Sequence, residues 1–153
     1  MSTAHVLQRR FEFDLSVIAK SPLVPLAGLR TLTGLDEDAV LYLIEDGQLP
    51  WAFDIAMPGA RKSELRVWRG AASTDLHTTS LDEVIADILG PSPLPTLKVR
   101  TLRHRFVCSS DHIHHLIAAG CLAETGGEER KQTTTRIVTR ASAAAFLKER
   151  RKA

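Results

Sequence analysis

The sequence predicts an α+β fold built from two small modules in tandem, each mostly helical with a short β-hairpin. A first observation is the motif L-I-x-x-G-x-L, which occurs at Leu43–Leu49 and again at Leu116–Leu122. A second is the segment Gly90–Thr96, GPSPLPT, whose prolines cannot continue a helix and favour an extended connector. Because this segment lies between the copies, the chain divides into an N-terminal strand or extension (1–20), a first module (21–90), a linker (91–96) and a second module (97–153).

Each copy of the motif is expected to end a helix. A good N-cap residue, Asp36 or Ser109, precedes apolar residues at helical spacing, and a glycine follows where helices commonly stop. A second apolar-periodic segment lies upstream in each copy, at 26–32 and at 97–105. The two helices with a short turn between them predict a helix-turn-helix unit in each module.

Strand-like segments follow the second helix of each module. In the first module they are LPWAFDIA and ELRVW, and in the second CLAET and TTRIVTR, each pair separated by a charged tip. Final helices are predicted from the capping box Ser80-x-x-Glu83 and from TRASAAAFLKERR near the C-terminus. The N-terminal RFEFDLSVI alternates like a strand, which either joins the first module or pairs with its counterpart in a dimer.

This order of elements, ending in RIVTRASAAAFL, resembles the winged helix-turn-helix of phage and mobile-element excisionases. The same module heads MerR-type regulators and is similar to the DNA-recognition domain of phage small terminase subunits. The resemblance covers about residues 96–150 and extends less closely to the first module. It implies a tandem winged helix-turn-helix protein whose second helix enters the major groove of double-stranded DNA, while the hairpin wing follows the minor groove or backbone.

The net charge of +2 hides an asymmetry between the modules. Residues 21–90 hold five Lys or Arg against eleven acids, and residues 91–153 hold twelve against five. The second helix of the first module, DEDAVLYLIED, carries five acids and would be repelled by phosphates. The second module is therefore expected to read DNA, and the acidic first module to bind a protein partner or self-associate. The alternative is that the two halves attract each other.

The DNA contacts are expected on three parts of the second module. Polar side chains at the start of a recognition helix can bond base edges or phosphates, the first helix supplies backbone contacts, and cations at the wing tip suit phosphates. Helical spacing places Asp111, His115 and Ala118 on the outward face of this helix, opposite its apolar stripe. A solvated surface is the competing interpretation for the histidines, and Asp111 opposes phosphate binding. The predicted contacts are Ser109, Ser110, His112, His114 and His115 on the second helix, Arg103 and Arg105 on the first, and Arg130, Lys131 and Arg136 on the wing.

No cofactor, metal or catalytic residue is predicted. The two cysteines lack the paired ligand spacing of zinc sites, and Cys108, aligned with Leu35, is expected to be a small buried hydrophobe. No apolar run is long enough to span a membrane, and a cytoplasmic location is expected. The sequence thus predicts a non-catalytic DNA-binding protein. The alternative is a protein adaptor or assembly factor that keeps the same fold without binding DNA.

Overall fold

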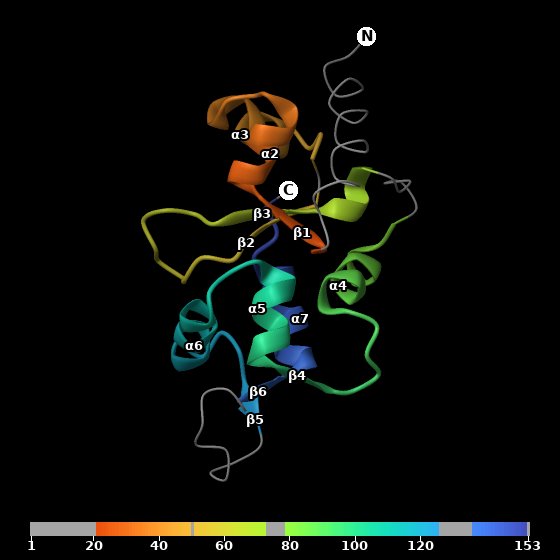
Figure 1. The fold of residues 1–153 in the computed structure, drawn as a ribbon, viewed down its shortest axis with the longest axis vertical. Helices are drawn as coiled ribbons and strands as arrows, with labels where there is room; N and C mark the ends of the chain where they lie inside the picture. The colour runs from red at the N-terminus through yellow and green to blue at the C-terminus, as the bar shows by residue number, and fades with distance from the viewer. Residues whose placement is uncertain (1–20, 50, 73–78, 126–135, 153) are drawn as a thin grey trace.

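The computed structural model describes residues 21–49, 51–72, 79–125 and 136–152, and shows an α+β fold with two small antiparallel sheets (Figure 1). Two repeats share the order strand, helix, helix, strand, strand, helix. The elements of the first repeat are β1 (Leu23–Pro25), α2 (Leu26–Thr33), α3 (Glu37–Glu45), β2 (Ala52–Asp54), β3 (Leu65–Trp68), the 3₁₀ turn η1 (Arg69–Ala72) and α4 (Leu81–Leu89). Those of the second are β4 (Thr96–Lys98), α5 (Val99–Phe106), α6 (Ser110–Ala118), β5 (Glu124–Thr125), β6 (Ile137–Thr139) and α7 (Arg140–Glu149).

Each sheet has three strands, in the orders β1-β3-β2 and β4-β6-β5. The outer strands pair with the central one in matching register, Val24 and Ala52 with Val67 in the first sheet. The hairpin strands agree with the sequence prediction, but the strands β1 and β4 were not expected. The helix predicted over 97–105 was wrong at its start, because Thr96–Lys98 pair with β6 and the helix begins at Val99.

The predicted helix caps are confirmed. The Asp36 carboxylate accepts a hydrogen bond from the Ala39 amide (2.8 Å), and the Ser109 hydroxyl accepts one from the His112 amide (3.1 Å). Ser80 likewise caps α4 by accepting from the Glu83 amide (3.2 Å). These bonds satisfy amides that the first helical turn leaves without partners.

The turn between the paired helices needs a left-handed residue in both repeats. Gly34 occupies it with φ 71° in the first repeat, and Val107 with φ 58° in the second. Val107 is the one non-glycine residue with positive φ in the described part of the chain. A β-branched residue is strained in this conformation, so the surrounding packing must hold it there.

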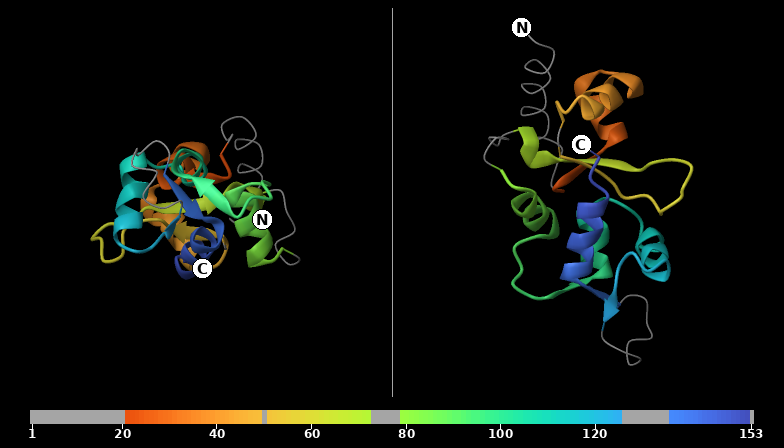
Figure 2. Two further views of the ribbon diagram at one scale, coloured as in Figure 1. Left: turned by 90° about the horizontal axis from the view of Figure 1, so that it is seen from below. Right: turned by 180° about the vertical axis from the view of Figure 1, so that it is seen from behind.

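The last helices of the repeats begin differently. α7 follows β6 directly, and the Thr139 hydroxyl caps it by accepting from the Ser142 amide (3.2 Å). In the first repeat Trp68 ends the strand and η1 follows it. A Cβ atom at Gly70 would overlap the Trp68 indole, so only glycine fits beside that ring. The helix α4 then starts at Leu81 and packs against α5 and α7 of the second repeat (Figures 1 and 2).

Among the residues that the structure describes, the buried side chains form two clusters. The smaller lies between α2, α3 and the first sheet, and includes Leu29, Val40 and Val67. The larger crosses from one repeat to the other, joining residues such as Phe53 and Ile88 to others such as Phe106. The proline-rich segment therefore links the two repeats in sequence, while their side chains share one hydrophobic cluster.

The predicted N-terminal strand over residues 11–17, and the wing residues Arg130 and Lys131, lie outside the described residues. Within the described ranges, no helix combines the length and the apolar character needed to cross a membrane.

Candidate nucleic-acid interface

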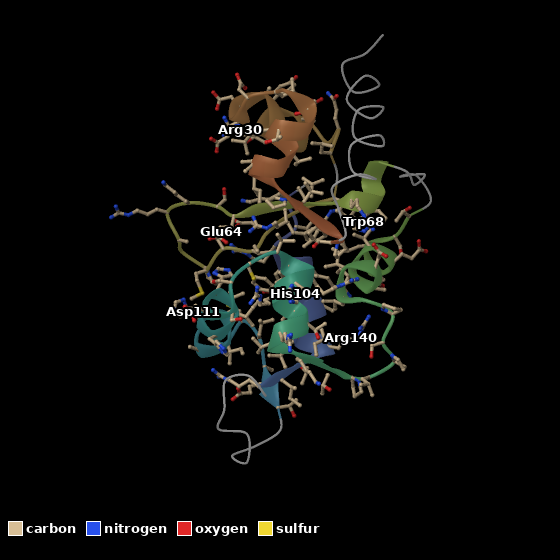
Figure 3. The ribbon with its side chains drawn as sticks, in the orientation of Figure 1. Arg30, Glu64, Trp68, His104, Asp111 and Arg140 are labelled. Carbon is tan, nitrogen blue, oxygen red and sulfur yellow. The ribbon has the colours of Figure 1, made fainter. Side chains whose placement is uncertain are left out.

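The helix α6 presents the face that the sequence predicted. Ile113 and Leu116 are fully buried, whereas Asp111, His115 and Ala118 are exposed (Figure 3 labels Asp111). Ser110 is half-buried at the first helical position. The exposed face therefore offers one histidine and one acid, with the helix N-terminus at one end.

The hairpin of the second repeat is tied to α6 at its base. A guanidinium nitrogen of Arg136, Nη1, lies 3.0 Å from Nδ1 of His114, and Arg136 Nε donates to the Glu124 carboxylate. His114 is half-buried, and the Glu124 carboxylate forms an ion pair with Arg136. The structure thus brings together two of the predicted DNA-contacting residues, one from the helix and one from the wing.

His112 faces the other repeat instead of solvent. Its Nε2 lies 2.6 Å from the Ile55 carbonyl oxygen, and its side chain is 14% exposed. Because a carbonyl only accepts hydrogen bonds, Nε2 carries the proton and donates. The Glu64 carboxylate lies 3.9 Å away on the same side of the ring. His112 therefore joins α6 to the connection between β2 and β3.

Arg105 is also engaged with the other repeat. It donates from Nε to the Ile88 carbonyl (2.7 Å) and from Nη2 to the Asp87 carbonyl (2.5 Å). These carbonyls lie in the last turn of α4, where backbone acceptors lack helical partners. Arg103 remains exposed on α5, together with other exposed cationic or imidazole side chains of the same region: Lys98, Arg100 and His104.

Two more arginines join the repeats in the same way. Arg66 of β3 donates to the Phe106 and Val107 carbonyls at the end of α5 (3.2 and 2.9 Å). Burial lowers the pKa of its guanidinium, which remains charged. Arg150 donates to the Asp54 and Ala56 carbonyls (2.9 and 3.2 Å) and pairs with the Asp54 carboxylate (3.3 Å).

The basic C-terminal segment pairs with the first sheet. Arg151 forms an antiparallel bridge with Phe53, and the Lys152 amide donates to the Ala52 carbonyl (2.8 Å). The Arg151 guanidinium lies over the Trp51 ring, 4.1 Å from its centroid, at cation–π distance. These residues thus cover the outer edge of β2.

Sequence reasoning assigned no contact to Arg61 and Lys62, which are exposed at the tip of the β2–β3 hairpin. The polar run MPGARKS marks a hairpin tip, but its place in the molecule depends on how the repeats pack. The available signal was the pair of adjacent cations in an otherwise acidic module.

The sequence predicted Cys108 to be a small buried hydrophobe, and the structure confirms this only in part. Cys108 is half-buried against the larger core cluster, and burial raises the pKa of its thiol to about 11. Among the described residues, no group of three or more His, Cys, Asp or Glu side chains is arranged to hold a metal ion.

We expect Cys108 to be alkylated about a hundredfold more slowly in the folded protein than in the unfolded chain at pH 8. The thiolate is the nucleophile, and a pKa near 11 leaves about one thiol in a thousand ionised at that pH, against about one in ten for an ordinary cysteine. Iodoacetamide labelling of a Cys121→Ser variant, followed by mass spectrometry, isolates Cys108. Equal rates in native buffer and in guanidinium would contradict the expectation.

Comparisons of the chain with models of protein families, with curated proteins and with solved structures find no significant match.

Proposed function

We propose that this protein is a non-catalytic double-stranded DNA-binding protein of the excisionase or regulator type, in which the second repeat is the main reader. In this proposal both repeats are winged helix-turn-helix modules. The observation that carries it is the contact between Arg136 and His114, which places the base of the β5–β6 hairpin beside the exposed face of α6. A helix and a neighbouring hairpin are the two parts that such modules apply to a duplex.

The charge of the second repeat supports this assignment. Residues 91–153 hold twelve Lys or Arg against five acids, and Lys98, Arg100 and Arg103 are exposed around α5. Cations at these positions can contact phosphates while the side chains of α6 reach the bases. The Ser109 hydroxyl accepts from the His112 amide and keeps its own proton available for a phosphate oxygen.

The proposed contact set is smaller than the one drawn from the sequence. His112 and Arg105 direct their nitrogens at carbonyls of the first repeat, so we assign them to the packing of the repeats. Ser109, Ser110, His114, His115, Arg103 and Arg136 remain in the set, with Arg130 and Lys131 of the wing.

The alternative is an adaptor that binds protein through the acidic first repeat. The exposed face of α3 combines acids with Tyr42, which is 62% exposed. A wide apolar patch over Leu41, Tyr42 and Leu49 would favour this alternative. Leu41 is half-buried and Leu49 is buried, so of these three side chains Tyr42 alone projects into solvent.

We expect the protein to bind mixed-sequence duplex DNA with an affinity that falls as salt rises, because cations on the protein release counterions from phosphates. Replacing Arg130, Lys131 and Arg136 together with alanine should make the slope of log K against log[salt] less negative by about 3 at most. Fluorescence anisotropy at several salt concentrations measures this slope.

The triple variant also removes the contact with His114, so circular dichroism should first show that it is folded. A folded wild-type protein that fails to bind at low salt would exclude the DNA-binding proposal and leave the adaptor alternative. An unchanged slope in the folded variant would exclude the second wing from the DNA contacts.

A further inference from the structure

The hairpin of the first repeat lies beside α6 of the second. Figure 1 shows the β2–β3 hairpin on the same side of the molecule as α6, and the view from behind in Figure 2 shows the same neighbours. The hydrogen bond from His112 to the Ile55 carbonyl (2.6 Å) joins the hairpin to α6 near the N-terminus of the helix. Met57 packs against the larger core cluster from the same segment. These contacts fix where the hairpin stands relative to α6.

The tip of this hairpin carries two adjacent cations, Arg61 and Lys62, both exposed. In the described part of the chain, no hydrogen bond or ion pair engages either side chain. The N-terminus of α6 is close to the hairpin and is itself positive, because the helix dipole places partial positive charge there. The helix dipole does not stabilise cations near this end, whereas a bound anion would interact favourably with both the cations and the helix.

Two acids face the same region. Glu64 lies at the foot of the hairpin beside His112, and Asp111 is exposed in the first turn of α6 (Figure 3). The Glu64 carboxylate is 3.9 Å from the His112 ring, so it lies toward the packing between the repeats. The two cations of the tip lie beyond Glu64 along the hairpin, since Arg61 and Lys62 precede the nearest strand-paired residue, Leu65, by four and three residues.

We propose that the first repeat's hairpin completes the DNA-binding surface of the second, with Arg61 and Lys62 contacting backbone phosphates beside the groove that α6 enters. The inference rests on the proposed function. In Figures 1 and 2, α6 lies between the β2–β3 hairpin and the β5–β6 sheet. A major groove about 12 Å wide has a phosphate backbone on each side, so a helix in it with a hairpin on either flank meets both backbones.

This arrangement gives the acidic first repeat a part in DNA binding that its helices cannot supply. Its helix α3 carries Glu37, Asp38 and Glu45 and would be repelled by a duplex. Its hairpin is held on the second repeat by Ile55 and Met57. In this proposal the first repeat contributes its β2–β3 hairpin to the DNA-binding surface around α6. Its own helix α3 takes no part in that surface.

The test replaces Arg61 and Lys62 with alanine in the full chain and measures the salt dependence of binding to mixed-sequence duplex DNA. Two lost phosphate contacts should make the slope of log K against log[salt] less negative by about 2. A second variant, Arg61→Glu with Lys62→Glu, should weaken binding further because it adds repulsion. Both cations are exposed and without partners among the described residues, so folding should be unaffected.

The matched control removes two exposed cations that lie away from α6: Arg30→Ala with Lys148→Ala. Arg30 lies on α2, at the opposite end of the first repeat from the second (Figure 3), and Lys148 pairs with the exposed Asp82 (3.0 Å). This control changes the net charge equally and should retain the wild-type slope. If the control changed the slope by the same amount, net charge alone would account for the effect, and the inference would be overturned.

The outcomes separate this inference from the proposed function. Wild-type binding that depends on Arg130, Lys131 and Arg136 but is unchanged without Arg61 and Lys62 would overturn the inference and leave the function standing. Absence of any binding by the folded wild-type protein would overturn the proposed function, and the inference with it.

Discussion

Replacing Phe106 with alanine is expected to lower the free energy of unfolding by about 3–5 kcal/mol, the usual cost of removing a buried phenylalanine side chain. Phe106 is the last residue of α5 and is fully buried. Its ring stacks on that of Phe146, with centroids 6.0 Å apart and planes inclined by 27°. Phe106 belongs to the cluster that crosses between the repeats, so its replacement should destabilise both repeats.

Tryptophan fluorescence reports whether a change in the second repeat destabilises the first. Both tryptophans of the chain, Trp51 and Trp68, lie in the first repeat, whereas Phe106 lies in the second. If the repeats unfold as one unit, the denaturant midpoint from tryptophan fluorescence should fall in the variant together with the midpoint from circular dichroism. A fluorescence midpoint that stays unchanged would show that the repeats unfold independently. As a control, Tyr42→Ala removes a ring that is 62% exposed and should change stability by no more than about 0.5 kcal/mol.

Replacing Arg150 with alanine is expected to cost about 2–4 kcal/mol, since breaking a mostly buried ion pair strands the remaining charge. Arg150 pairs with the Asp54 carboxylate (3.3 Å), whose side chain is 10% exposed. It also donates to the Asp54 and Ala56 carbonyls. The variant would leave two carbonyls and one carboxylate short of a donor, although the Ala56 and Glu64 amides still donate to Asp54.

Two further variants make the Arg150 result interpretable. Lys148→Ala removes an ion pair to Asp82 of similar length (3.0 Å), but these side chains are 50% and 80% exposed, so the cost should stay below about 1 kcal/mol. Arg150→Lys keeps the charge without the forked geometry and should fall between the two. Urea denaturation followed by tryptophan fluorescence measures all three. Equal stability of the Arg150 and Lys148 variants would contradict the buried ion pair as a source of stability.

Local features of the fold were predictable because local chemistry determines them. Asp36, Ser80 and Ser109 were recognised as helix caps, and each accepts the expected amide. The repeated motif placed α3 and α6, because apolar spacing and a following glycine mark where such a helix lies and ends. The first repeat departs from the second after Trp68, where Gly70, a poor helix former, lies against the indole ring.

The packing between the repeats was not predictable from the same patterns. Apolar periodicity shows which face of a helix is buried, but not which element buries it. His112 bonds a carbonyl 57 residues away, Arg66 one 40 residues away and Arg150 one 96 residues away. Each is a residue type that normally faces solvent, and the partners are backbone carbonyls, which leave no mark in the sequence.

The candidate site was predictable to the same extent, in its local features but not in its contacts between the repeats. The exposed face of α6 followed from helical spacing, and Asp111, His115 and Ala118 lie on it as expected. The separation of cations into surface and packing roles did not follow, because Arg103 and Arg105 differ only in which side of α5 they occupy. Arg105 meets the end of α4, whose position depends on the shared core.

The bridge between Phe53 and Arg151 joins two segments that are synthesised at different times. β2 is an outer strand of its sheet, and the segment that covers its free edge is synthesised about a hundred residues later. Until then the edge presents unpaired amides and carbonyls, which can pair with another chain. A nascent chain that stops within the second repeat therefore exposes the unpaired edge of β2. Fragments that end before Arg150 are expected to aggregate when this protein is expressed.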